Sequence, residues 1–259
     1  SLEPVLPDPA EPDVLSLAFE PLVDVVARVP KHPQLRVVPA AVADFDGLRT
    51  MTTYNNNGVS TSLGTAAEPA FWNSNATRGD GRQVVVPVLS MVTVLRSLTE
   101  VEIPYLKTDM QGADFAAVSA AHDAGLLRQI PYLLTEVWLY NEQSYLGFDN
   151  DLCRHWLPLM DRAGYSLVFV RVIESAEYKT WSADYRESWS QAWAYNPHVQ
   201  CAADLADDAH QRRPGLFEAD VHWIRNDTFH AILYPSGDGA AKKPKRPPVA
   251  SHHDWPLFF

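Results

Sequence analysis

Short apolar runs alternate with segments of helical spacing through most of this chain, and this alternation limits its fold more than any other feature. The runs that predict buried strands are residues 14–19, 35–42, 105–108, 132–139 and 165–173. The segments with apolar residues at helical spacing are residues 22–29, 92–98, 115–127 and 151–163. Alternating strands and helices form a parallel sheet with helices on both faces, so the sequence predicts an α/β fold.

The remaining segments give weaker signals. Residues 51–54 and 83–88 are short extended segments, and the polar stretch 55–62 between them is a loop. The tryptophan-rich residues 177–195 indicate either core packing or a mouth for an apolar acceptor. Closing antiparallel strands are expected at residues 219–225 and 229–234.

Three segments are expected along the chain. They are an exposed, proline-rich leader at residues 1–13, one domain at 14–236, and a basic, proline-rich tail at 237–259.

Charge and composition exclude several classes of partner. The formal net charge is −11, which opposes binding to nucleic acid, because such binding needs clustered Lys and Arg. No apolar stretch approaches the roughly 20 residues that a membrane-spanning helix requires. Cys153 and Cys201 match neither a disulfide framework nor a zinc-ligand spacing, so two free thiols are expected.

Three acidic residues lie where predicted strands end, and each has two interpretations. Glu20 can accept both hydrogen bonds of a ribose diol, or it can stabilise the start of the next helix. Asp109 can face a ligand, with Gly112 allowing a close backbone approach, or it can cap the following helix. Glu136 lies among Leu and Val, where an unpaired acid is costly, so a functional or paired role is favoured.

Several motifs, taken in order, resemble the FkbM family of class I, S-adenosylmethionine-dependent methyltransferases. Its members run strand, Phe-Glu-Pro, helix, strand, Asn/Gly/Ser-rich loop and then a Lys-x-Asp-x-x-Gly motif. The order and spacing agree across residues 14–173 and more loosely to about residue 226. The matching segments are residues 17–21, 37–44, 58–63, 86–88, 106–114 and 135–137.

The resemblance implies a Rossmann-like, mostly parallel sheet with an antiparallel closing strand. It implies S-adenosylmethionine as the methyl donor, and O-methylation of a small-molecule, sugar (glycan) or polyketide-like acceptor. On that basis Glu20 holds the donor ribose, Asp44 lies near the adenine and Ser90 also contacts the cofactor. Asp109 lies between donor and acceptor as orienter, base or metal ligand, and Glu136 lines the same cleft as the second catalytic candidate. A divalent cation at Asp109, Glu136 and Asp114 is a further option, because hard ions bind carboxylate oxygens.

The chain also departs from the family pattern. Family members carry a glycine-rich loop just before the Phe-Glu-Pro segment, whereas residues 1–13 contain no glycine. We therefore expect the central first strand to be absent from this chain. Gln111 stands where Glu is usual, and Trp138 where His often follows. These departures favour an alternative function, that of a catalytically inactive, methyltransferase-like binding or scaffold protein. No glycine fingerprint for a nicotinamide or nucleotide-sugar donor is found.

Overall fold

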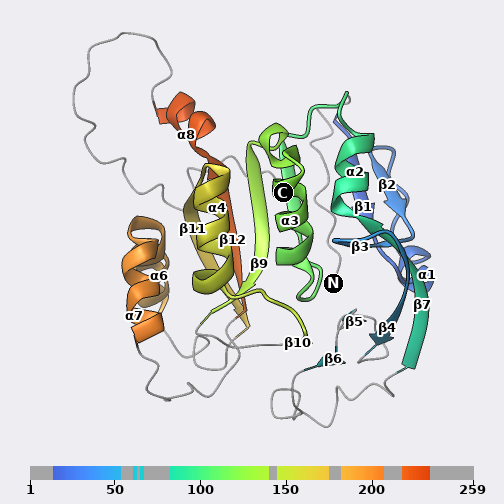
Figure 1. Ribbon diagram of the computed structural model, residues 1–259, viewed down its shortest axis with the longest axis horizontal. Coiled ribbons are helices and arrows are strands. Elements are labelled where there is room, and N and C mark those ends of the chain that lie inside the picture. The colour runs from blue at the N-terminus through green and yellow to red at the C-terminus, as the bar shows by residue number, and fades with distance from the viewer. Residues whose placement is uncertain are drawn as a thin grey trace.

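The computed structural model describes residues 14–53, 61–62, 65–66, 82–139, 145–174, 182–206 and 218–233 (Figure 1). The expected leader at 1–13, the tail at 237–259 and most of the polar loop at 55–62 lie outside these residues. Those predictions, and the domain boundaries that depend on them, stay predictions.

The largest sheet has the strand order β11-β12-β9-β8. Its strands are β8 (Tyr105–Thr108), β9 (Tyr132–Trp138), β11 (Tyr165–Glu174) and β12 (Glu218–Arg225). β8 is parallel to β9, and β12 is antiparallel to both β9 and β11. β8, β9 and β11 therefore run in the same direction, and the antiparallel closing strand predicted at residues 219–225 is confirmed.

The first part of the chain forms smaller sheets. Their strands are β1 (Ser16–Phe19), β2 (Leu35–Val38), β3 (Ala41–Ala43), β4 (Gly47–Thr53), β5 (Thr61–Ser62), β6 (Thr65–Ala66), β7 (Arg82–Ser90) and β10 (Tyr145–Leu146). β1 pairs with β2 in parallel, β10 pairs with β6, and the third small sheet has the order β3-β7-β4-β5. The single strand expected at residues 35–42 is wrong. It is divided between β2 and β3 at Pro39, which has no N–H to donate to a sheet.

Most of the helices follow the predicted segments. They are α1 (Val23–Val26), α2 (Met91–Ser97), α3 (Asp114–Asp123), the 3₁₀ turn η1 (Leu126–Gln129), the π-helical turn η2 (Leu152–Trp156), α4 (Leu157–Ala163), α6 (Ala183–Tyr195), α7 (Pro197–Ala206) and α8 (Asn226–Leu233). The strand expected at residues 229–234 is wrong, because this segment lies largely in α8. Phe229, Ile232 and Leu233 are three and four residues apart, which suits one face of a helix as well as a short strand.

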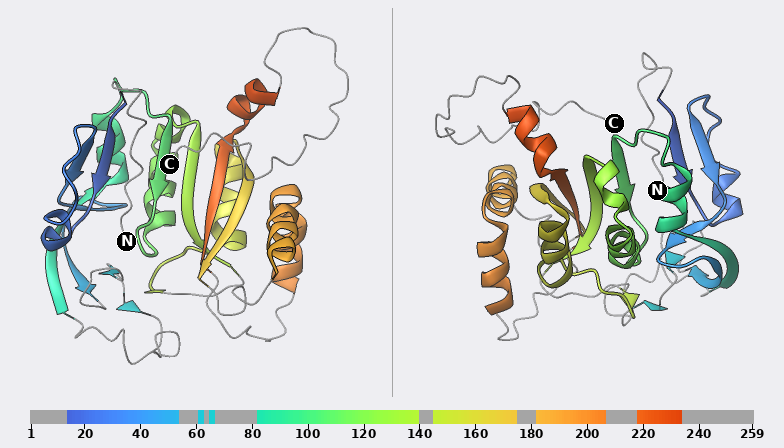
Figure 2. Two further views of the ribbon diagram at one scale, coloured as in Figure 1. Left: turned by 180° about the vertical axis from the view of Figure 1, so that it is seen from behind. Right: turned by 45° about the horizontal axis from the view of Figure 1, so that its top comes forward.

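One large core lies on one face of the four-stranded sheet. Leu133, Val137 and Val221 from the strands pack in one cluster with Val118 of α3 and Met160 of α4. Figure 2 shows α3 and α4 behind the strands when the molecule is seen from behind, with no described helix in front of them. The chain therefore has a mixed α/β fold, but a Rossmann-like arrangement with helices on both faces of one sheet is not confirmed.

The tryptophan-rich region contributes to this core. Trp193 of α6 is 2% exposed and belongs to the large cluster, and the partly buried Trp189 packs against it. For these two residues the core-packing interpretation is confirmed; residues 175–181 lie outside the described residues.

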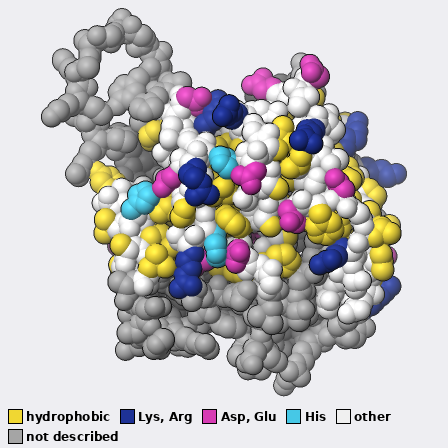
Figure 3. All heavy atoms as spheres, in the orientation of Figure 1, with side chains coloured by type: hydrophobic (Ala, Val, Ile, Leu, Met, Phe, Trp, Pro, Cys, Tyr) yellow, Lys and Arg dark blue, Asp and Glu magenta, His cyan; other side chains and the backbone are white. Residues whose placement is uncertain are grey.

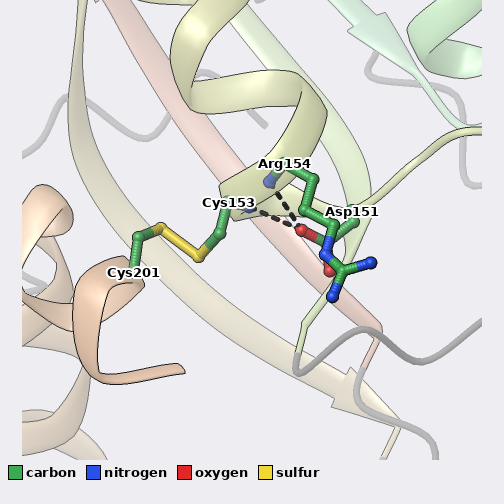
Figure 4. Close-up of a disulfide and its surroundings, with 4 residues drawn as sticks. All are labelled: Asp151, Cys153, Arg154 and Cys201. Carbon is green, nitrogen blue, oxygen red and sulfur yellow. Dashed lines mark hydrogen bonds between the residues drawn. A yellow bond between two sulfur atoms is a disulfide. The ribbon is translucent and has the colours of Figure 1, made fainter. Parts of the chain in front are cut away.

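Cys153 and Cys201 form a disulfide bond, so the expectation of two free thiols is wrong (Figure 4). Their Cα atoms are 5.2 Å apart although the residues are separated by 48 positions. η2 brings Cys153 to α7, where both side chains are buried against the core. Spacing along the chain could not predict this pairing, because it depends on how α7 folds back onto η2.

The described surface is mixed in charge. In the view of Figure 3, acidic and basic side chains are interspersed between apolar ones. Among the described residues, no helix is long and apolar enough to span a bilayer.

Candidate active site

The turn after β8 presents Asp109 at the surface. The Asp109 side chain is 45% exposed, and its Oδ2 lies 3.4 Å from Lys107 Nζ. Gln111 Nε2 donates to Asp109 Oδ1 at 3.0 Å. α3 begins instead after Ala113, which makes no side-chain capping bond, so the alternative of Asp109 as a helix cap is wrong.

Asp114, the first residue of α3, is fully buried. The Met110 N–H donates to both of its carboxylate oxygens at 3.1 Å, and the Gly112 N–H donates to Oδ2 at 3.3 Å. Burial, and next the charge of Asp109, raise the pKa of Asp114 to about 7, against the lowering effect of hydrogen bonds that include the one from the Met110 N–H. The protonated form of Asp114 is therefore favoured more than in an exposed aspartate.

Glu136 lies near the end of β9 and is 4% exposed. Its Oε1 has no hydrogen-bond partner among the described residues. Burial first, and then the charges of Glu218, Asp109 and Asp114, raise the pKa of Glu136 well above its ordinary value. The side chain still has a hydrogen bond with Asp109, but a buried acid with one unsatisfied oxygen is expensive to keep and is common in functional sites.

Asp220 of β12 lies directly opposite Glu136 in the sheet register. Burial raises its pKa, and Lys107 and Arg171 act in the opposite direction. The structure thus brings the two predicted catalytic residues together with Asp114 and Asp220. Asp220 was missed from the sequence because it is 84 positions from Glu136 (220 − 136) and only the antiparallel pairing of β12 unites them.

Glu20 follows β1, which pairs with β2 in a separate two-stranded sheet and not with the strands that carry Asp109, Glu136 and Asp220. Its Oε1 accepts the Leu22 N–H at 2.8 Å, immediately before α1. Burial raises the pKa of Glu20, partly offset by that hydrogen bond and by the charge of Arg28. This contact agrees with a helix-terminal role, and the ribose-binding role stays a prediction.

Asp44 lines a cavity of about 350 Å³. The opposite wall is formed by α3, including Phe115 and Asp123, and by Phe148 and Asp149. Neither Asp109 nor Glu136 lines this cavity, but Phe148 also contacts the position of Gly112 in the turn after β8. Phe148 therefore lies between the cavity and the turn that carries Asp109.

Ser90, the third predicted cofactor residue, caps α2. Its Oγ accepts the Thr93 N–H at 3.0 Å and donates to Asp46 Oδ2 at 3.1 Å. Asp46 Oδ1 also accepts the Ser90 N–H at 2.7 Å. The hydroxyl group is thus engaged in a local capping network, and its contact with a cofactor stays a prediction.

No group of three or more His, Cys, Asp or Glu side chains in the described ranges is arranged to hold a metal ion. Asp109, Glu136 and Asp114 are therefore not arranged as a cation site, and that option gains no support.

The residues fit a nucleoside-bearing donor only in part. Asp44 lies in a cavity with an aromatic wall, as an adenine contact requires. Glu20 is not among the residues that line this cavity. The roles of Asp44 and Glu20 in binding a donor therefore stay predictions.

The comparisons with known proteins agree with the motifs. A protein-family model described as the methyltransferase FkbM domain matches residues 10–167, which is more than half of the 259 residues. No curated protein and no solved structure matches the chain.

Proposed function

Since the chain belongs to the FkbM methyltransferase family, we propose that it transfers a methyl group from S-adenosylmethionine to a hydroxyl group of a small-molecule, glycan or polyketide-like acceptor. The observation that carries the proposal is the placement of Asp109 and Glu136 at the ends of neighbouring parallel strands, one exposed and one buried. Ligands of α/β sheets bind outside the carboxyl ends of the strands, which supports this location for the reaction.

When bound, S-adenosylmethionine supplies an electrophilic methyl carbon on a sulfonium centre. Asp109 accepts the proton of the acceptor hydroxyl, since its carboxylate is exposed and oriented by Lys107 and Gln111. Glu136 lies behind it as a buried acid whose raised pKa favours the protonated form, so it adds no second negative charge beside Asp109. Asp44 would hold the adenine and Glu20 the ribose. Much of the rate in such a displacement comes from positioning, so these residues act mainly by orientation.

The test combines donor binding and turnover in the full chain. S-adenosylmethionine and S-adenosylhomocysteine are titrated calorimetrically, and methyl transfer is followed with radiolabelled donor and a panel of monosaccharides and hydroxylated polyketides. Asp109→Asn is expected to lower turnover about 100-fold or more, as loss of a general base does. Asp24→Asn, on the exposed face of α1, is the matched control and should leave turnover unchanged. Equal turnover in the Asp109 variant and the control would refute the role of Asp109.

Gln111, which stands where the family pattern has Glu, favours the second candidate, an inactive methyltransferase-like binding or scaffold protein. Donor binding without methyl transfer to any acceptor in the panel would support it. Methyl transfer above the no-protein rate would exclude it.

A further inference from the structure

The turn between β8 and α3 has a backbone that is unfavourable in isolation. Gln111 has a φ of +52° and Gly112 a φ of +100°. Left-handed conformations are disfavoured for residues with a Cβ atom, so Gln111 needs support from outside its own backbone. The support comes from Asp114, whose carboxylate accepts the N–H groups on both sides of Gln111, those of Met110 and Gly112.

We propose that Asp114 is the positioning residue of the active site, and that its buried carboxyl group fixes the left-handed turn that directs Asp109 and Gln111 toward the acceptor. The identity of the acceptor in this statement rests on the proposed function. The fixing of the turn does not, and it can be measured in the absence of any methyl transfer.

The turn determines how Asp109 is held. Gln111 donates to Asp109 Oδ1 at 3.0 Å, and Lys107 Nζ lies 3.4 Å from Oδ2. Both oxygens thus have a partner within the segment 107–111. A change in the backbone of Gln111 would move its amide away, and the Asp109 carboxylate would keep Lys107 and the hydrogen bond with Glu136 but lose the partner that orients Oδ1.

The turn is also set against β9. A Cβ atom at Gly112 would lie 3.1 Å from Phe148 Cδ2 and 3.2 Å from Trp138 Cζ2. Trp138 ends β9 two residues after Glu136, so the same contact fixes the turn relative to the second catalytic candidate. Asp114 thereby acts on Asp109 through the backbone and on its relation to Glu136 through packing.

Two charged groups act on the Asp114 carboxyl group from its surroundings. Asp109 acts from the same turn, and Glu136 acts from β9. Thr108 adds a hydroxyl group from the end of β8. These groups also belong to the candidate active site. The effect of a substitution at Asp114 is therefore best measured at the Met110 and Gly112 amides and in the activity that depends on Asp109.

The first experiment measures amide hydrogen exchange by NMR in the full chain. Asp114→Asn keeps the size of the side chain but places an NH₂ group or a single oxygen opposite two N–H donors. Exchange at Met110 and Gly112 is expected to rise at least tenfold, with no change in Asp24→Asn. Unchanged exchange at both amides would overturn the proposal.

A measurement on the unaltered chain covers the case in which Asp114→Asn does not fold. The amide shifts of Met110 and Gly112 should titrate with the same midpoint as the Asp114 carboxyl carbon. Separate midpoints would show that the carboxyl group does not hold these amides, and would overturn the proposal.

A double-mutant cycle separates positioning from a general structural role. If Asp114 acts through Asp109, kcat in Asp109→Asn/Asp114→Asn equals that in Asp109→Asn alone, and donor affinity stays within twofold of the unaltered chain. Additive losses in kcat would overturn the positioning role while leaving the proposed function intact. If the unaltered chain transfers no methyl group but the amide results hold, the proposed function fails and the fixing of the turn stands.

Discussion

The two halves of the described fold differ in the amount of core that supports them. The four-stranded sheet shares one cluster that includes Trp156, Trp193 and Trp223, each at most 2% exposed. Among the described residues, the sheet of β3, β7, β4 and β5 has a smaller cluster, which consists of Ala41, Ala43, Met51, Val86 and Val88 with Leu22, Phe45 and Val84 packed against it. On the small-core half, Leu48 of β4 and Val85 of β7 remain 72% and 68% exposed.

The candidate residues divide along the same line. Asp109 and Glu136 stand on the large-core half and are close enough for their charges to interact. Glu20 and Ser90 stand on the small-core half, and each is engaged in a local contact at a helix start. The well-packed half thus holds its candidate acids in one group, whereas in the other half Glu20 and Ser90 belong to separate contacts at the starts of two helices.

The largest expected effect on stability comes from creating a cavity in the large core. Trp223→Ala should lower the free energy of unfolding by about 3–5 kcal/mol, because the side chain is fully buried and its Nε1 donates to Thr135 Oγ1. Met51→Ala in the small cluster should cost about 2 kcal/mol. Urea denaturation of both variants measures the difference, and equal losses would mean that the two halves are equally well packed.

The turn after β8 should be the next most sensitive position. Gly112→Ala combines a left-handed residue with contacts to Phe148 and Trp138, so a loss of about 2–4 kcal/mol is expected. Gly125 has a φ of +73° but open space around its Cβ position, so Gly125→Ala should cost only about 1–2 kcal/mol. The difference between the two losses in unfolding free energy measures the cost of the contacts with Phe148 and Trp138. Thermal or urea unfolding of both variants gives this difference. A Gly125 variant as damaging as the Gly112 variant would contradict the packing argument.

The buried acids should make stability depend on pH. The folded-state pKa of Glu136 is raised, so its stabilising contribution is present below the unfolded pKa near 4.5 and is lost as pH rises through the folded pKa. Glu136→Gln should therefore flatten the decline in stability above pH 4.5, by up to about 1.4 kcal/mol per pH unit. Denaturation between pH 5 and 8 checks this, with Asp24→Asn as control. If the unfolding free energy changes with pH in the same way in Glu136→Gln and in Asp24→Asn, the pH dependence comes from a group other than Glu136.

The smallest expected effect lies on the small-core half. Ser90→Ala removes the cap of α2 and should cost about 1 kcal/mol. Ser97→Ala, at the other end of α2, loses only a bond from its hydroxyl to Val94 O and should change little. If Ser90→Ala has no effect on stability, the hydroxyl group is free for another role, which would strengthen its predicted contact with a cofactor.

The sequence predicted the strands of the large-core half well, but α6 and α7 lie in segments for which no helix was predicted. β8, β9 and β11 fall on three predicted strands, because continuous apolar runs between turn residues are a strong local signal. The same local signal led to errors elsewhere. Pro39 breaks the strand expected at residues 35–42. Residues 229–233 form a helix where a strand was expected, because the apolar residues of so short a segment fit the spacing of a helix as well as that of a strand.

The composition of the site was predictable only in part. Asp109 and Glu136 stood out because each acid follows an apolar strand in a family-like motif. Asp220 and the Cys153–Cys201 bond did not stand out, because both depend on contacts between segments far apart in the chain. Asp114 was noticed only as a possible metal ligand, since its hydrogen bonds to Met110 and Gly112 follow from the left-handed turn and not from residue type.

The Cys153–Cys201 bond gives the molecule a second covalent route between η2 and α7 (Figure 4). Cys153 lies inside the family-matched segment and Cys201 beyond it, so the bond ties the two parts into one closed ring that includes β11 and α6. Hydrolysis of any single peptide bond within that ring would leave every piece attached. The fragments would separate only after reduction of the disulfide bond. A protease cut there would therefore give separate fragments on a reducing gel but not on a non-reducing one.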